Sequence, residues 1–158
     1  MNKPYLLERE QWVPASLDEG FRFFSDAANL ELLTPPWLRF QILTPQPIAM
    51  FPGTLIDYKL HWHGIPMRWR TKITAWQPPN AFEDLQLQGP YRLWHHTHRF
   101  QAVDGGTFIH DRVKYSLPFG IIGQMVHTFS VRRNVESIFA FRERKVAEIL
   151  GSRDTRQS

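Results

Sequence analysis

Two histidines and one aspartate stand where a short hairpin could bring them together for acid/base chemistry. His96, His98 and Asp111 flank the segment Val103-Asp-Gly-Gly106, whose central Asp-Gly pair predicts a two-residue hairpin turn. In that register His98 faces Asp111 across the strands, and His96 points to the same side of the sheet. A carboxylate that bonds one imidazole nitrogen fixes its tautomer. His98 is therefore predicted as a general acid/base and Asp111 as its orienting partner.

The same pair also has a structural interpretation. A buried histidine and aspartate on neighbouring strands can satisfy each other's hydrogen bonds without doing any chemistry. No serine or cysteine nucleophile stands beside them in the sequence. Both interpretations stay open on the sequence alone.

Four histidines between residues 95 and 110 raise the question of a metal site. In this register His95 points away from His96 and His98, and His110 lies on the face opposite Asp111. Two histidines and one aspartate remain, which is a chemically possible set of ligands. Because core and surface histidines are commoner than ligating ones, we expect no metal and no other cofactor.

Large aromatic side chains share the inward face with the histidines. The chain has six Trp and twelve Phe, more than a plain core requires, and flat rings suit the wall of a cavity. An apolar wall with a few converging polar groups is typical of a small-molecule pocket. With lining added from the last helix, the predicted ligand-binding residues are Tyr58, Trp62, Trp69, Trp94, His96, Phe100, Val113, Tyr115, Ile122, Met125 and Phe129.

The first part of the chain predicts a strand and two short helices. Residues 5–13 have the pattern of a strand. Ser16-Leu-Asp-Glu19 has the form of a capping box, in which the first and last residues bond each other's backbone N–H groups. The helix that follows runs to Phe24, and Asp26 can cap a second short helix that ends before Pro35.

Strand periodicity continues from residue 38 to residue 118. Residues 54–63 and 67–77 predict a hairpin in which His63 pairs with Pro66, leaving one face apolar and the other charged. Residues 38–44 and 81–88 predict further strands. The pattern of residues 81–88 is compatible with two inward faces: Phe82, Asp84 and Gln86, or Glu83, Leu85 and Leu87.

After Phe119 the period changes to three and four residues, which predicts a long amphipathic helix over residues 121–150. A sheet with one apolar face needs cover, and this helix is long enough to supply it. We therefore predict an α+β helix-grip fold. It consists of a curved antiparallel sheet of six to seven strands around a long C-terminal helix, with two short helices after the first strand. Residues 1–151 are predicted to form a single domain, and residues 152–158 a disordered polar tail.

Composition narrows the possible partners. No run approaches the roughly 18 apolar residues of a membrane helix. Residues 1–5 lack the apolar stretch of a signal peptide, so we expect a cytoplasmic protein without integral membrane association. The absence of Cys excludes disulfides and thiolate metal ligands. A formal charge of +4 with scattered basic residues does not favour nucleic-acid binding.

Several motifs stand in the same order as in a known superfamily. They include Val13-Pro-Ala-Ser-Leu-Asp-Glu-Gly-Phe21, Gly89-Pro-Tyr-Arg-Leu-Trp94, His96, His98, Asp111, Tyr115 and Ile138-Phe-Ala-Phe-Arg142. With the order of elements, they resemble the START/Bet v1-like (SRPBCC) superfamily, in particular its bacterial single-domain cyclase/dehydrase-like ligand-binding proteins, over about residues 5–150. The resemblance implies the helix-grip fold and a ligand cavity between sheet and helix. Because this fold hosts carriers, sensors and enzymes, no universal catalytic motif is carried over.

Three functions follow as hypotheses. The first is binding or carriage of a small hydrophobic molecule, of aromatic, polyketide-like or isoprenoid/lipid type, in a cavity between the sheet and the C-terminal helix. The alternative is an enzyme of the polyketide cyclase/dehydratase type that uses His98 and Asp111 without a metal. The third is a protein-partner module, and transient contact with a membrane surface stays open beside it.

Overall fold

One antiparallel sheet and one long helix make up most of the structure, a computed structural model that describes residues 3–152. Within these residues seven strands follow the order β1-β7-β6-β5-β4-β3-β2. Residues 153–158 of the predicted polar tail lie outside the described residues. The strands are β1 (Tyr5–Val13), β2 (Gln41–Ile42), β3 (Leu55–Trp62), β4 (Ile65–Gln77), β5 (Ala81–Gln88), β6 (Leu93–Val103) and β7 (Gly106–Ser116).

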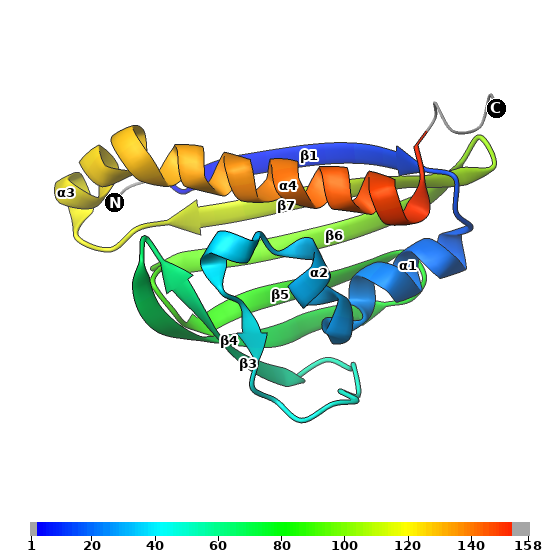
Figure 1. Ribbon diagram of the computed structural model, residues 1–158, viewed down its shortest axis with the longest axis horizontal. Helices are drawn as coiled ribbons and strands as arrows, with labels where there is room; N and C mark the ends of the chain where they lie inside the picture. Colours follow the sequence, from blue (N-terminus) through cyan, green and yellow to red (C-terminus); the bar gives the residue numbers. More distant parts are fainter. Residues whose placement is uncertain (1–2, 153–158) are drawn as a thin grey trace.

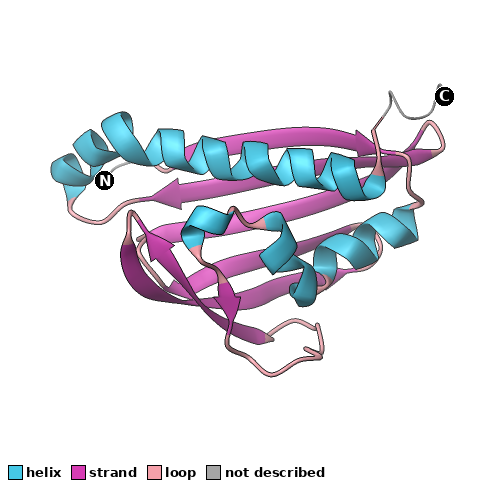
Figure 2. Cartoon of the chain, viewed as in Figure 1, coloured by secondary structure: helices cyan, strands magenta, loops and turns pink. Residues whose placement is uncertain are grey.

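The helices lie on one face of this sheet (Figures 1 and 2). Two short helices, α1 (Leu17–Ser25) and α2 (Leu30–Leu33), follow the first strand. The C-terminal helix is helical without a break from Gly120 to Leu150. It consists of α3 (Gly120–Val126), a π-helical turn (His127–Val131) and α4 (Arg132–Leu150). The predicted helix-grip α+β fold is confirmed.

The hairpin of β6 and β7 has the predicted register throughout. Val103 pairs with Gly106, and His98 pairs with Asp111. Asp104 and Gly105 both have positive φ angles, of 52° and 73°, as a two-residue turn of this type requires. Because side chains alternate along a strand, this turn sets which residues of both strands face the helix.

The hairpin of β3 and β4 is shifted by two residues from the prediction. His61, not His63, pairs with Pro66, because the turn is formed by His63 and Gly64, whose φ angles are 49° and 79°. A shift of two residues keeps every side chain on its predicted face. Asp57 consequently lies opposite Arg70 on the outer face, and the two form a bidentate ion pair with N–O distances of 2.7 and 3.1 Å.

The strand predicted over residues 38–44 is mostly not a strand. Its first part belongs to a 3-10 turn (Pro36–Leu38), and Arg39 takes a left-handed conformation with φ 47°. Only Gln41–Ile42 pair with β3. The buried Leu38 side chain explains why this segment has an apolar pattern without being part of the sheet.

The predicted capping box of α1 is confirmed. The backbone N–H of Glu19 donates to the Ser16 side chain at 3.2 Å, and the Ser16 N–H donates to the Glu19 carboxylate at 3.4 Å. The helix buries Phe21 and Phe24, whose rings pack against Phe100 of β6. This contact holds α1 against the inner face of the sheet.

Helix α4 packs across the sheet through a stripe of buried apolar residues that includes Val135, Phe139 and Val146. The side-chain amide of Gln11 on β1 donates to the backbone carbonyl of Glu143 at 2.9 Å, which also holds the helix to the sheet. Together these contacts fix the rotation of α4 and therefore decide which of its side chains face inward.

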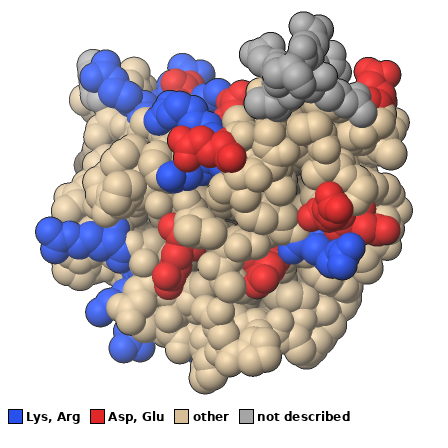
Figure 3. Space-filling view, turned by 45° about the vertical axis from the view of Figure 1, so that its right-hand side comes forward, with Lys and Arg blue, Asp and Glu red and all other residues tan. Residues whose placement is uncertain are grey.

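The surface combines both charge signs with exposed apolar groups. On the face in Figure 3, Lys and Arg lie among Asp and Glu, and uncharged residues cover most of the area. The segment around α3 exposes Phe119, Ile121, Ile122, Met125 and Val126. Among the described residues, no helix combines the length and apolar character needed to cross a bilayer.

Replacing Gly106 with Ala is expected to lower the free energy of unfolding by about 1–3 kcal/mol, the usual cost of overpacking. A β-carbon at this position would overlap the Val13 carbonyl oxygen and the Trp12 ring. Chemical denaturation measures the loss. Gly20→Ala in α1 is the matched control, because its β-carbon meets Thr107 at an ordinary 3.5 Å. Equal stability of the two variants would contradict the close packing at Gly106.

Candidate functional site

A cavity of about 160 Å³ lies between the inner face of the sheet and helices α1 and α4. Most of its wall is apolar or aromatic, and half of the lining residues come from strands β3 to β6, where the alternation of each strand turns them toward the helix. The wall includes six residues of the predicted site, namely Tyr58, Trp62, Trp69, Trp94, His96 and His98.

Besides Asp111, three other residues of the predicted site are buried but do not line the cavity. Phe100 packs with Phe21 and Phe24 in one part of the core, and Val113 lies in another. The Tyr115 hydroxyl bonds Nε2 of His127 at 2.8 Å. These positions face the helix correctly, but close packing fills the space above them.

The structure does not bring two of the three residues predicted from the start of the long helix to the cavity. Ile122 and Met125 are 68% and 59% exposed and lie outside the cavity wall. Figure 1 shows the reason: α3 extends past the end of β7, so no sheet lies beneath it. Phe129 was also predicted to contact ligand, but its side chain is outside the described part of the structure.

Several residues of the cavity wall are not among the predicted site residues, although Phe82 and Asp84 belong to one of the two inward faces that the sequence allowed. Most are apolar residues whose inward position depends on how separate elements pack. Asp84 and Arg142 are the polar ones that matter for chemistry. The others include Phe24, Leu38, Phe40, Met50, Ile56, Ile73, Phe82, Tyr91, Ile138 and Phe139.

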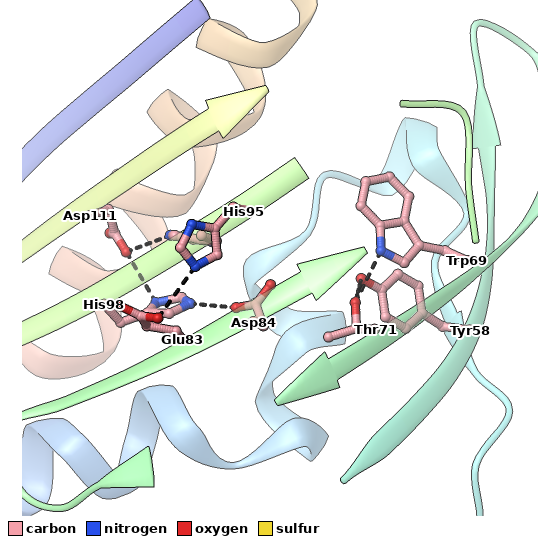
Figure 4. A network of polar contacts seen from close by, with 9 residues as sticks. Tyr58, Trp69, Thr71, Glu83, Asp84, His95, His98 and Asp111 are labelled. Carbon is pink, nitrogen blue, oxygen red and sulfur yellow. Dashed lines mark hydrogen bonds and ion pairs between the residues drawn. The ribbon is translucent and has the colours of Figure 1, made fainter. Parts of the chain in front are cut away.

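Histidines and aspartates alternate in a buried chain beside the cavity. Nε2 of His96 lies 2.8 Å from Oδ1 of Asp111, and Nε2 of His98 lies 2.8 Å from Oδ2 of Asp84. Nδ1 of His98 is also 3.1 Å from Oδ1 of Asp111, although that pair lacks the alignment of a hydrogen bond. Figure 4 shows His98 between the two carboxylates.

Strand β5 supplies Asp84 because its inward face is the one that carries Phe82. Phe82 stacks on His98 with ring centroids 4.0 Å apart, whereas Glu83 points outward and pairs with His95. Of the two inward faces that the sequence allowed for residues 81–88, the structure has the one with Phe82 and Asp84. The possible Glu83–His95 pairing on the outer face was the sequence signal for this choice, because it requires Asp84 to point inward.

The two carboxylates are held charged by their neighbours. Burial by itself raises the pKa of Asp111, but the hydrogen bond from His96, the nearby His98 imidazole and the charge of Arg142 hold that pKa well below 3.8. Burial likewise raises the pKa of Asp84, and the hydrogen bond from His98 outweighs it, so the pKa is lowered. Both aspartates are therefore anionic near neutral pH.

The pKa values of the two histidines are shifted in opposite directions. Burial and the neighbouring His98 lower the pKa of His96 to about 4, so this imidazole is neutral near pH 7. Burial also acts to lower the pKa of His98, but the carboxylates of Asp111 and Asp84 outweigh it and raise the pKa above 6.5. Environment thus separates the two imidazoles, as acid/base sites require.

This arrangement changes the role predicted for His98. Both of its ring nitrogens face carboxylates, so neither is free for a ligand. Neutral His96 presents its Nε2–H to Asp111, which leaves a lone pair on Nδ1. Among the described residues, that nitrogen has no hydrogen-bond partner. His96 is therefore better placed than His98 to accept a proton or a hydrogen bond from a bound molecule.

Asp84, His96 and His98 could in principle hold a metal ion, since one candidate ligand atom from each lies within 4.8 Å of the others. Two imidazoles and a carboxylate are a known ligand set. An ion would first have to displace the hydrogen bonds that both Nε2 atoms make to carboxylates. The geometry fits a hydrogen-bonded chain better than a prepared metal site.

A second polar group lies on the opposite part of the cavity wall (Figure 4). The Tyr58 hydroxyl and the Trp69 indole N–H both contact Oγ1 of Thr71, at 3.1 and 3.0 Å. Burial raises the pKa of Tyr58, so its phenol remains protonated. These bonds hold two aromatic rings of the cavity wall in fixed orientations.

Solved structures share this fold at low sequence identity. A protein from Thermus thermophilus is 20% identical with a TM-score of 0.64, and the match covers 91% of this chain and 98% of that one. Ara h 8.0201 is 19% identical with a TM-score of 0.59, covering 92% and 99%. The di-domain ARO/CYC StfQ from the steffimycin biosynthetic pathway is 12% identical with a TM-score of 0.72, covering 98% and 52%. At these identities the likeness concerns the fold alone.

Sequence comparison gives the family. No curated protein matches the sequence significantly. Residues 13–140, which are most of the chain, match the family described as polyketide cyclase / dehydrase and lipid transport. The match includes β5, β6, β7 and the part of α4 that reaches Ile138 and Phe139. The chain therefore belongs to the polyketide cyclase / dehydrase and lipid transport family, within the START/Bet v1-like (SRPBCC) superfamily.

Proposed function

We propose that the protein binds a small, ring-containing hydrophobic molecule in the cavity between the sheet and α4. The observation that carries the proposal is the aromatic wall formed by Tyr58, Trp62, Trp69 and Trp94, into which a few polar groups are set. Apolar enclosure provides affinity, and a small number of polar groups gives orientation. Membership of a family described by polyketide cyclases, dehydrases and lipid transport supports the same class of ligand.

The size of the cavity limits the ligand. Its volume of about 160 Å³ is close to that of an engineered apolar cavity that takes up one benzene molecule. A single aromatic ring with a short substituent fits this space. A polycyclic or isoprenoid molecule would have to move side chains of the wall.

Wild-type protein is expected to bind nitrobenzene, an uncharged single ring, saturably and with quenching of its tryptophan fluorescence, because three Trp residues line the cavity. Ala27→Leu should weaken this binding strongly, since Ala27 is a buried wall residue and a larger side chain fills the space. Ala102→Leu on the surface of β6 is the matched control. Equal quenching of wild type and both variants, or no quenching of any of them, would contradict the proposal. Native mass spectrometry of gently purified protein tests whether a ligand is retained.

A second candidate function is cyclase/dehydratase-type catalysis, and the buried His96–Asp111 pair beside the cavity favours it. A base at Nδ1 of His96 could remove a proton next to a carbonyl group while hydroxide leaves as water. The probe is 4-hydroxy-4-phenylbutan-2-one, whose loss of water gives a conjugated ketone detected by its absorbance. Catalysis predicts a faster reaction with wild type than with His96→Gln. Rates equal to buffer for both proteins would exclude it for this substrate class.

A further inference from the structure

Arg142 is a charged residue in the wall of an otherwise largely apolar cavity. It projects from α4, one turn beyond Ile138 and Phe139, which also line the cavity. Its guanidinium carbon lies 5.4 Å from the centroid of the Phe24 ring, a distance typical of a cation–π contact. The aromatic ring on one side and the packing of α4 hold this side chain in place.

Two donors of this guanidinium are buried without a partner. Nε and Nη2 of Arg142 are inaccessible to solvent, and neither makes a hydrogen bond to any described residue. An arginine side chain stays protonated at any ordinary pH, so these N–H groups cannot avoid the cost of burial by losing a proton. Leaving buried charged donors unsatisfied is costly, and proteins rarely do it without a reason.

The ion pair of Arg70 shows which group the Nε and Nη2 edge of an arginine binds well. Nε and Nη2 of Arg70 donate to the two carboxylate oxygens of Asp57 as a planar fork, at 2.7 and 3.1 Å. This bidentate geometry matches a carboxylate and makes Arg the preferred residue for recognising one. Arg142 carries the same pair of donors, covered at present, on a side chain that is part of the cavity wall.

Other charges near the cavity are already matched by hydrogen bonds. The Asp84 carboxylate bonds His98, and the Asp111 carboxylate bonds His96. Arg142 acts on both aspartates through its charge, but it has no hydrogen bond to either. Among the described residues that line the cavity, Arg142 is therefore a cation without a hydrogen bond to an anion.

We propose that Arg142 recognises the carboxylate of a small aromatic acid, with the ring of that acid enclosed by Tyr58, Trp69 and Trp94. The inference rests on the proposed ligand-binding function and narrows it to a chemical class. One ring and one short acidic substituent agree with the volume of about 160 Å³. The carboxylate would receive two charge-assisted hydrogen bonds from Nε and Nη2.

The test compares trans-cinnamate with its neutral amide, cinnamamide, by isothermal titration calorimetry at neutral pH. Wild type is expected to prefer cinnamate. Arg142→Met keeps the apolar stem and removes the fork, so it should weaken cinnamate binding by about ten- to a hundredfold, as expected for losing hydrogen bonds to a charged group. Cinnamamide binding should change little. Arg142→Lys keeps the charge without the fork and should fall between the two proteins.

Arg144→Met is the matched control, because Arg144 is exposed on the same helix. It should bind cinnamate like wild type, and thermal melts verify that each variant is folded. Equal affinity of wild type for cinnamate and cinnamamide, or cinnamate binding by Arg142→Met within twofold of wild type, would overturn the role of Arg142. Those results would leave ligand binding itself intact if nitrobenzene still binds. Failure of all three molecules to bind would overturn both proposals.

Discussion

The free energy of unfolding is expected to fall by about 3 kcal/mol as the pH is lowered from 6.5 to about 4, because His96 is buried and neutral. The folded protein resists protonation of His96 down to a pKa of about 4, whereas the unfolded chain takes up this proton near pH 6.5. The unfolded state therefore binds more protons in this interval, and acid favours it. Urea denaturation at several pH values measures the slope.

The other groups of the chain act in different pH ranges. The raised pKa of His98 contributes stability that is fully present below pH 6.5 and is lost as the pH rises through the folded pKa. The lowered pKa values of Asp84 and Asp111 contribute stability above pH 3.8 that is lost as the pH falls through their folded pKa values. Burial also lowers the pKa of His127, which adds to the slope in the same direction as His96.

Replacing His96 with Gln should flatten this pH dependence, since an amide can still donate to Asp111 but does not titrate. His61→Gln on the outer face of β3 is the control and should keep the wild-type slope. A His96→Gln protein that loses stability between pH 6.5 and 4 as steeply as wild type would contradict the assignment of the slope to His96.

Replacing Asp111 with Asn is expected to lower the free energy of unfolding by about 2–3 kcal/mol at neutral pH, the usual loss for a hydrogen bond to a charged group. The carboxylate is buried, bonds His96 and lies 3.1 Å from Nδ1 of His98. An amide keeps the shape but removes the charge that faces the two imidazoles. Chemical denaturation of variant and wild type gives the difference.

Asp57→Asn is the matched control, because it makes the same chemical change in an exposed ion pair with Arg70 and should have a much smaller effect. Asp111 does not line the cavity, so its variant should bind nitrobenzene within twofold of wild type. If Asp111→Asn instead kept full stability and lost only turnover of the hydroxyketone, the aspartate would be a positioning residue for catalysis and not a structural one.

Local turn chemistry explains why part of the site could be predicted. The Asp104-Gly105 turn determines the pairing of β6 with β7, so the sequence was sufficient to bring His96, His98 and Asp111 to one face. The β3–β4 turn was placed one residue too late along the chain, which shifted the pairing by two residues. Because side chains alternate with a period of two, Tyr58, Trp62 and Trp69 still faced inward.

The partners of these residues could not be predicted in the same way. The pairing of β4 with β5 is interrupted by two irregularities, near Arg70 and near Ile73, so no simple count along the chain decides the face of Asp84. Without Asp84, His98 was expected to have a free nitrogen. In the structure the Asp84 carboxylate bonds that nitrogen, so the accessible lone pair is the one on Nδ1 of His96.

The long helix is the clearest case in which the sequence predicts an element but not which of its side chains are buried. Its apolar period was sufficient to predict its existence and its place over the sheet. It did not show that α3 extends past the end of β7, where no strand lies beneath it and Ile122 and Met125 are exposed.

The sequence by itself therefore determined the fold, the β6–β7 register and the aromatic inward face, because these depend on turns and periods within single elements. The tertiary structure decided that Ile122 and Met125 are exposed, that Asp84 completes the histidine chain and that Arg142 faces the cavity. Each of these depends on how one element is rotated or shifted against another, and that is set by packing across the whole core.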